Sequence, residues 1–163
     1  MTDEVISAAT ALIKLCVQKG LKVATAESCT GGLVAGALTE VPGSSAVLDR
    51  GFVTYSNAAK QQMLGVSADT LRDHGAISRE TAEAMARGAL GKASADIVVA
   101  ITGVAGPGGG SADKPVGLVH FAAASRSGTL THAEMRYGDI GRGNVRHKSV
   151  LQALAMLKRL AET

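Results

Sequence analysis

Aromatic residues are scarce in this sequence: its 163 residues include two Phe, two Tyr and no Trp. The core must therefore be aliphatic, and an apolar content of 46% is enough for one domain over residues 1–163. No basic segment is interleaved with aromatics, which argues against base stacking. The net charge of +3 is slight and scattered, so we expect a small anionic ligand as the partner and no nucleic acid.

Cysteines, metal-binding motifs and long apolar runs are also few or absent. The two cysteines, Cys16 and Cys29, do not suggest the disulfide framework of a secreted domain. The sequence has no CxxC or HExxH motif and its four histidines are dispersed, so we expect no metal and no cofactor. No apolar run is long enough to span a bilayer, and Asp3 and Glu4 stand where a signal peptide carries basic residues. We therefore expect a cytoplasmic protein with no membrane partner.

Along the chain, apolar residues recur with the spacing of strands in some segments and with the spacing of helices in others. Residues Ile97 to Ile101 are continuously apolar, which is typical of a strand covered on both faces of a parallel sheet. A hairpin turn is predicted at 125–128, and Asn57 is a candidate helix N-cap. The predicted strands are 21–25, 47–55, 96–101, 116–124 and 129–137, and the predicted helices are 4–18, 33–39, 58–64, 143–160 and two that Ser67 and Ser78 open. This order predicts a three-layer α/β/α sandwich with a mixed, mostly parallel sheet.

The segment Ala26–Gly32, which reads A-E-S-C-T-G-G, joins a predicted strand to a predicted helix. Ligands of open α/β sheets bind beyond the carboxyl ends of strands, and Ser28 lies at such an end. Its hydroxyl, beside glycines and the free N–H groups of a helix start, is a candidate nucleophile. Cys29 is a rival nucleophile without an evident base, and Ser28 and Thr30 can instead serve only as helix caps.

A nucleophilic hydroxyl needs a base, and the segment Tyr55–Lys60 supplies a candidate. Desolvation can lower the pKa of a lysine and keep it neutral, so that Lys60 would accept the proton of Ser28. Tyr55 could relay that proton or hold the base in place, and serine–lysine pairs are an established alternative to the Ser-His-Asp triad. The competing interpretation leaves Lys60 on the exposed face of a short helix.

The glycine-rich loop Thr102–Gly110 follows the most strand-like segment of the chain. Its glycines let backbone N–H groups approach an anion, but it matches neither the phosphate loop GxxxxGK[ST] nor a dinucleotide fingerprint, and it can also be a simple connector. Arg142 and Arg146, at the start of the last predicted helix, are candidate phosphate ligands or solvated residues. The candidate substrate-binding residues are Thr30, Gly31, Gly32, Thr102, Gly103, Gly106 and Arg142.

Six motifs occur in one order along the chain: T-A-E-S-C-T-G-G, V-P-G-S-S, Y-S-N-x-A-K, G-A-I-S-x-E, A-I-T-G-V-A-G-P-G-G-G and K-P-V-G. Together they resemble the CinA C-terminal domain family, which includes stand-alone nicotinamide-nucleotide amidohydrolases, and the resemblance covers essentially the whole chain. It implies hydrolysis of the carboxamide of nicotinamide mononucleotide to nicotinate mononucleotide and ammonia, a step of pyridine-nucleotide salvage.

The resemblance also assigns roles to individual residues. Ser28 matches the family's nucleophile, Lys60 its general base and Tyr55 the tyrosine that assists them. Thr102 and Arg142 match positions associated with substrate binding and catalysis. The family commonly carries an acid directly before this arginine, whereas this sequence has a glycine there, which leaves Arg142 and Arg146 as alternative phosphate ligands.

Two other classes of function compete with the amidohydrolase. A catalytically silent nucleotide-binding module, linked to competence or DNA damage, would bind the mononucleotide without releasing ammonia. A nucleotide-dependent oxidoreductase would explain the glycine-rich loop, but no GxGxxG motif follows the first predicted strand. The small size and the apolar helices also predict a homo-oligomer, for which no interface stands out.

Overall fold

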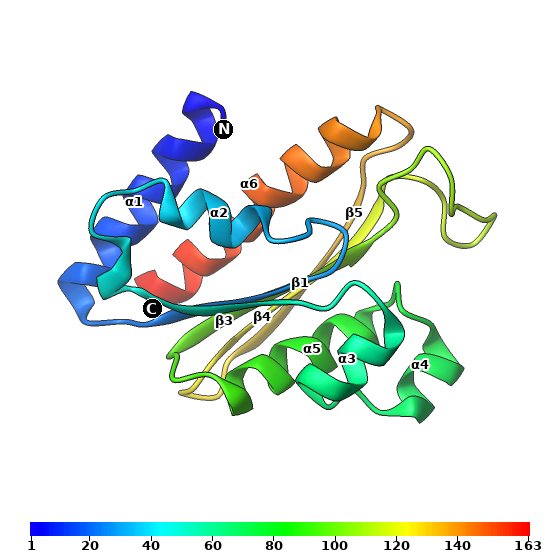
Figure 1. Ribbon diagram of the computed structural model, residues 1–163, viewed down its shortest axis with the longest axis horizontal. Helices are drawn as coiled ribbons and strands as arrows, with labels where there is room; N and C mark the ends of the chain where they lie inside the picture. Colours follow the sequence, from blue (N-terminus) through cyan, green and yellow to red (C-terminus); the bar gives the residue numbers. More distant parts are fainter.

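The computed structural model describes all 163 residues as strands and helices arranged around one sheet (Figure 1). The strands are β1 (Val23–Glu27), β2 (Leu48–Val53), β3 (Ile97–Gly103), β4 (Leu118–Ser125) and β5 (Leu130–Arg136). The helices are α1 (Asp3–Lys19), α2 (Leu33–Thr39), α3 (Asn57–Leu64), α4 (Ala68–His74), α5 (Arg79–Lys92) and α6 (Arg142–Glu162), with a short 3-10 helix η1 (Ser44–Ala46) before β2. Each predicted strand and helix is present, with bounds that differ by a few residues at most.

The five strands lie in the order β2-β1-β3-β4-β5. β1 pairs in parallel with β2 and with β3, whereas β4 is antiparallel to both of its neighbours. The sheet is therefore mixed, as predicted, and β4 alone runs against the direction of the other strands. The register pairs Glu27 with Val53 on one side and with Ile101 on the other. As a result the chain leaves β1, β2 and β3 at the same edge of the sheet.

Helices cover both faces of the sheet and make the three layers (Figure 1). The larger core lies between the sheet and α1, α2 and α6, and it includes Leu12, Val99, Phe121 and Leu157. The smaller core lies against α3, α4 and α5 and is rich in alanine, with Met85 as its largest buried side chain. Burial of β4 and of all but the last residue of β3 between these layers explains why both sequences are mostly apolar.

Serine side chains cap the N-termini of α3, α4 and α5. Ser67 and Ser78 accept the N–H groups of Thr70 and Thr81, so both predicted N-caps are confirmed. The predicted cap Asn57 is wrong by one residue, because the Oγ of Ser56 accepts the N–H of Ala59 and Asn57 is the first helical residue. Serine and asparagine are both strong N-caps, so the sequence Ser-Asn left the helix start ambiguous by one position.

Candidate active site

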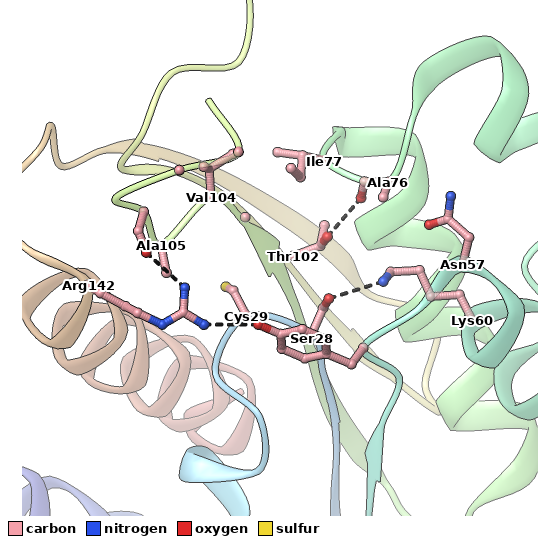
Figure 2. A pocket seen from close by; sticks show the side chains of 15 residues that line it. Ser28, Cys29, Asn57, Lys60, Ala76, Ile77, Thr102, Val104, Ala105 and Arg142 are labelled. Atoms are coloured by element: carbon pink, nitrogen blue, oxygen red, sulfur yellow. Dashed lines mark hydrogen bonds between the residues drawn. The ribbon is translucent and has the colours of Figure 1, made fainter. Parts of the chain in front are cut away.

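A cavity of about 240 Å³ opens at the edge of the sheet where β1, β2 and β3 end (Figure 2). Its wall combines the residue pair after β1, the start of α3, the segment before α5, the loop after β3 and the first residue of α6. The lining residues that carry polar side chains are Ser28, Cys29, Tyr55, Asn57, Lys60, Thr102 and Arg142. Five segments distant in sequence thus converge at the carboxyl ends of three parallel strands, where α/β proteins bind ligands.

Ser28 lies on a tight turn between β1 and α2. Its N–H donates to the carbonyl of Ile101 at 2.9 Å, and its own carbonyl accepts the N–H of Gly31 at 2.9 Å. Gly31 and Gly32 have φ values of +58° and +100°, which side chains rarely adopt, so glycine is needed here to turn the chain into the helix. The Ser28 side chain is 8% exposed and faces the cavity.

The first turn of α2 is hydrogen-bonded by Glu27, which the sequence did not single out. This residue is 1% exposed, and its two carboxylate oxygens accept the N–H groups of Val34 and Ala35 at 2.9 and 3.0 Å. Thr25 donates its hydroxyl to the same carboxylate. The competing interpretation of Ser28 and Thr30 as helix caps is therefore wrong, because Gly32 occupies the N-cap position and no side chain there bonds the helix.

Lys60 reaches from α3 to the nucleophile candidate. Its Nζ lies 3.0 Å from the Oγ of Ser28 and 2.9 Å from the carbonyl oxygen of Thr54, as Figure 2 shows for the first contact. The side chain is 1% exposed and is bonded to no carboxylate, and this burial lowers the pKa of the Lys60 amine from its usual range. The competing interpretation, a solvated Lys60 on an exposed helix face, is wrong. A lysine in this setting can lose its proton and act as a base.

Cys29 lies beside Ser28 but differs from it in chemistry. Burial raises the pKa of the Cys29 thiol to about 12, so the thiol stays protonated at neutral pH. A thiol is a much weaker nucleophile than a thiolate, and no base is bonded to this one. The geometry therefore favours Ser28 over Cys29 as the nucleophile.

Tyr55 and Arg142 form a pair at the mouth of the cavity. The Nη2 of Arg142 donates to the hydroxyl of Tyr55 at 2.9 Å, and its Nη1 donates to the carbonyl of Gly106 at 2.8 Å. Tyr55 is 60% exposed and does not bond Lys60, so the structure places it with the arginine and not on the base. Arg142 has no carboxylate partner, which leaves its positive charge available to an anion in the cavity.

Arg146, the alternative phosphate ligand, lies elsewhere. Its guanidinium donates to the carbonyl oxygens of Cys29 and Thr30, at 3.1 and 3.4 Å, and does not line the cavity. Arg142 does line it, so the geometry favours Arg142 for any contact with a ligand. Sequence distance alone could not separate these two residues, which stand one helical turn apart.

The remaining predicted positions divide into two groups. Thr102, Gly103 and Gly106 line the cavity, and the Thr102 hydroxyl donates to the carbonyl of Ala76 at 2.8 Å. A Cβ on Gly103 would lie 2.7 Å from a backbone oxygen of β4, so only glycine fits there. The second group, Thr30, Gly31 and Gly32, is not among the lining residues and continues the turn directly after Cys29, which does line the cavity.

One feature of the site was not predicted from the sequence. Asn57 lines the cavity with a side chain that makes no hydrogen bond, although the sequence indicated only a helix cap. The free backbone N–H groups that the sequence predicted beside Ser28 include those of Cys29 and Thr30, which have no acceptor. No group of three or more His, Cys, Asp or Glu side chains is placed to hold a metal ion. None of the helices has the length and apolar character of a membrane span.

The family model and the similar proteins point to the same family. Residues 6–161 match the CinA C-terminal domain. A nicotinamide-nucleotide amidohydrolase PncC of Enterobacter agglomerans is 54% identical over 119 residues, which cover 73% of each chain. A CinA-like protein of Parasynechococcus marenigrum is 48% identical over 97% of this chain but only 37% of its own length, so the chain spans little more than a third of that relative.

Solved structures agree over the whole chain. The competence/damage inducible protein CihA from Agrobacterium tumefaciens is 56% identical, with a TM-score of 0.97 over 100% of this chain and 98% of that one. A CinA superfamily protein from Klebsiella pneumoniae is 37% identical, with a TM-score of 0.91 over 97% and 98% of the two chains. These structures therefore share both the fold and a substantial part of the sequence with this chain.

Proposed function

Since the chain belongs to the CinA C-terminal domain family, we propose that it hydrolyses the carboxamide of nicotinamide mononucleotide to nicotinate mononucleotide and ammonia. The name of the Enterobacter relative supports this substrate. The observation that carries the proposal is the 3.0 Å contact between the buried Nζ of Lys60 and the Oγ of Ser28. The reaction would serve cytoplasmic pyridine-nucleotide salvage.

In the first step, neutral Lys60 accepts the hydroxyl proton of Ser28, and the Oγ attacks the carboxamide carbon. The carbonyl oxygen of the substrate becomes an oxyanion. The N–H groups of Cys29 and Thr30 have no acceptor and directly follow Ser28 in the turn, and we assign them to this oxygen. The loss of one such donor raises the barrier by about 3 kcal/mol.

In the second step, the oxyanion collapses and the carbon–nitrogen bond breaks. The Lys60 ammonium returns its proton to the leaving nitrogen, so that ammonia departs and a nicotinate ester remains on Ser28. Lys60 is then neutral again and takes a proton from a water molecule, whose oxygen attacks the ester carbon. Cleavage of the ester releases nicotinate mononucleotide, and the same proton restores the Ser28 hydroxyl.

The substrate phosphate is assigned to Arg142. This guanidinium lines the cavity, has no carboxylate partner and already bonds the Gly106 carbonyl of the glycine-rich loop. A phosphate could take the donor that now reaches the Tyr55 hydroxyl. Tyr55 would thus contribute at the mouth of the cavity through Arg142, at a distance from the proton transfer.

An ammonia-release assay on nicotinamide mononucleotide, its riboside and free nicotinamide tests the proposal. We expect turnover of the mononucleotide, weaker turnover of the riboside, and loss of activity by at least about 10³-fold in Ser28→Ala and Lys60→Ala. Circular dichroism controls for folding. Near-normal ammonia release in either variant would rule out the serine–lysine mechanism.

The same samples separate the proposal from its competitors. A silent binding module would bind the mononucleotide in a calorimeter and release no ammonia, whereas an oxidoreductase would change the absorbance of a nicotinamide cofactor. Self-association stays a prediction, and light scattering coupled to size-exclusion chromatography measures it.

A further inference from the structure

Arg146 lies outside the cavity and contacts the backbone of the turn that carries Ser28. Its Nε and Nη2 bond the carbonyl oxygens of Cys29 and Thr30, residues 117 and 116 positions away in the sequence. No carboxylate is paired with it, so its donors serve the backbone of the turn. A Cβ on Gly31 would lie only 3.4 Å from its Nη2, so the turn comes close to the guanidinium where it has no side chain.

Because peptide groups are planar, the contacts of Arg146 with backbone carbonyl oxygens also fix the direction of the neighbouring N–H groups. In a trans peptide, the C=O and the N–H point in opposite directions. The Cys29 carbonyl belongs to the same peptide as the Thr30 N–H, so its bond to Arg146 directs that N–H away from α6. The neighbouring Ser28 carbonyl is held by the N–H of Gly31, which fixes the Cys29 N–H in the same manner.

We propose that Arg146 is a positioning residue that holds the Cys29 and Thr30 N–H groups in place to receive the oxyanion. This inference rests on the proposed amidase mechanism, since the oxyanion forms only if Ser28 attacks a carbonyl carbon. Without the guanidinium, nothing in the structure fixes the plane of the Cys29–Thr30 peptide, and rotation of that plane would point its carbonyl dipole at the negative oxygen. A donor turned away contributes nothing to the transition state.

Arg126, at the far end of the sheet, is a matched control that separates a positioning role of Arg146 from a purely structural one. Arg126, in the hairpin between β4 and β5, also uses its guanidinium on backbone carbonyls, those of Leu90, Ala93 and Ala95. It bonds more carbonyls than Arg146 does and lies away from the cavity. Loss of either arginine removes hydrogen bonds to the backbone, but only Arg146 bonds the turn that carries Ser28.

Steady-state kinetics on nicotinamide mononucleotide distinguish the two roles. We expect Arg146→Met to lower kcat by about 100-fold, with KM within about twofold of wild type, because the lost contacts act on the transition state. Arg146→Lys should recover part of kcat, since one ammonium can still bond a carbonyl. Arg126→Met should keep wild-type kcat although it unfolds at a lower temperature. Equal kcat losses in Arg146→Met and Arg126→Met, or a change in KM alone, would overturn the proposal.

A second readout does not depend on the substrate. Phenylmethanesulfonyl fluoride sulfonylates an activated serine through an attack that also places negative charge on oxygen, and intact mass spectrometry follows the labelling of Ser28. We expect Arg146→Met to react at least about tenfold more slowly than wild type and Arg126→Met.

The two readouts also separate failure of this inference from failure of the proposed function. Absence of ammonia release with normal, Arg146-dependent labelling would reject the substrate and retain the role of Arg146. Equal labelling rates in wild type and Arg146→Met would reject that role alone. A wild-type protein that neither reacts with the reagent nor releases ammonia would overturn both, because Ser28 would then not be an activated nucleophile.

Discussion

Two glycine-rich segments leave neighbouring strands at the same edge of the sheet, but the structure holds them very differently. The turn after β1 is short, and Ser28, Cys29 and Thr30 are all buried in it. A carboxylate fixes one side of this turn to α2, and a guanidinium fixes the other side to α6. In the loop after β3, residues 107–113 are exposed, and the contacts that tie it down are few.

This difference matches what the two segments would do in the proposed reaction. A nucleophile must be placed to within a fraction of an ångström, because a displacement of about 1 Å can cost 100-fold in rate. A loop that surrounds a flexible nucleotide needs close approach of its backbone, which glycine provides, and tolerates more adjustment. Paired substitutions, one in or beside each segment, can therefore test whether the turn governs kcat and the loop governs KM.

The pair Lys60→Met and Arg142→Met should give the largest contrast. Lys60→Met removes the base that faces the turn, and we expect kcat to fall by about 10³-fold. Arg142→Met removes the charge that faces the loop, and we expect KM for the mononucleotide to rise by about tenfold with a smaller change in kcat. Ammonia release at several substrate concentrations measures both constants. A larger effect of Arg142→Met on kcat than on KM would break the comparison.

Lys60→Met should also raise stability near neutral pH. Burial lowers the pKa of Lys60 below the value near 10.5 that it has in the unfolded chain, so the unfolded state binds more protons between the two values. Wild-type stability therefore rises with pH across that window. We expect the variant to be more stable than wild type by about 1 kcal/mol at pH 7, and the difference to shrink as the pH approaches 10.5.

The kinetics should follow the same titration, because only neutral Lys60 can accept the proton of Ser28. We expect kcat/KM of the wild type to increase with pH and to level off below pH 10.5. Urea unfolding and initial rates over a common pH series measure the two effects together. A variant less stable than wild type at pH 7, or a rate independent of pH, would contradict this account of Lys60.

The second contrast concerns what holds each segment. Glu27→Gln puts an amide NH₂ group against one of the two N–H donors of α2, so we expect a loss of about 2 kcal/mol in stability and about 10- to 100-fold in kcat. Lys114→Met removes the bond from the loop to the carbonyl of His74. This contact is exposed, so stability should change by less than about 0.5 kcal/mol. An unchanged kcat in Glu27→Gln would show that the hydrogen bonds from Glu27 to α2 do not position Ser28.

The smallest contrast uses two glycines. Gly31 has a φ of +58° and approaches Arg146, whereas Gly108 has no positive φ and no atom near the place of a Cβ. We expect Gly31→Ala to cost about 1 kcal/mol in stability and several-fold in kcat, since alanine is strained at this φ. Gly108→Ala should be within about 0.5 kcal/mol of wild type. Thermal unfolding and kcat on matched samples give the comparison, which equal effects of the two substitutions would refute.

Much of the fold could be predicted because the strands and helices are marked locally. The apolar run of β3 and the serines that begin α4 and α5 fix those elements almost to the residue. The bounds of β1 were less clear. A strand predicted over 21–25 lies at Val23–Glu27, because the apolar Leu21 extends the local pattern, whereas pairing with β2 and β3 runs from Val23 to the charged Glu27. Strand order depends on contacts between distant segments, which periodicity does not contain.

The candidate site was predictable in its parts and less so in its connections. Strand ends pointed to Ser28 and to the loop after β3, and both line one cavity. The pairing of Tyr55 with Arg142 joins residues 87 positions apart, and no local pattern indicates it. Glu27 was overlooked because it lies five residues before Gly32, the N-cap of α2, and still accepts hydrogen bonds from the first turn of that helix. No common capping motif describes this spacing.

The placement of the Ser28–Lys60 pair has a consequence for how activity relates to assembly. Ser28 is held by α2 and α6 on one face of the sheet, whereas Lys60 arrives on α3 from the opposite face. A chain with only one helical layer in place would contain a nucleophile without its base, or a base without its nucleophile. Hydrolysis would therefore be a property of the finished protein alone, and no earlier folding stage could consume the substrate.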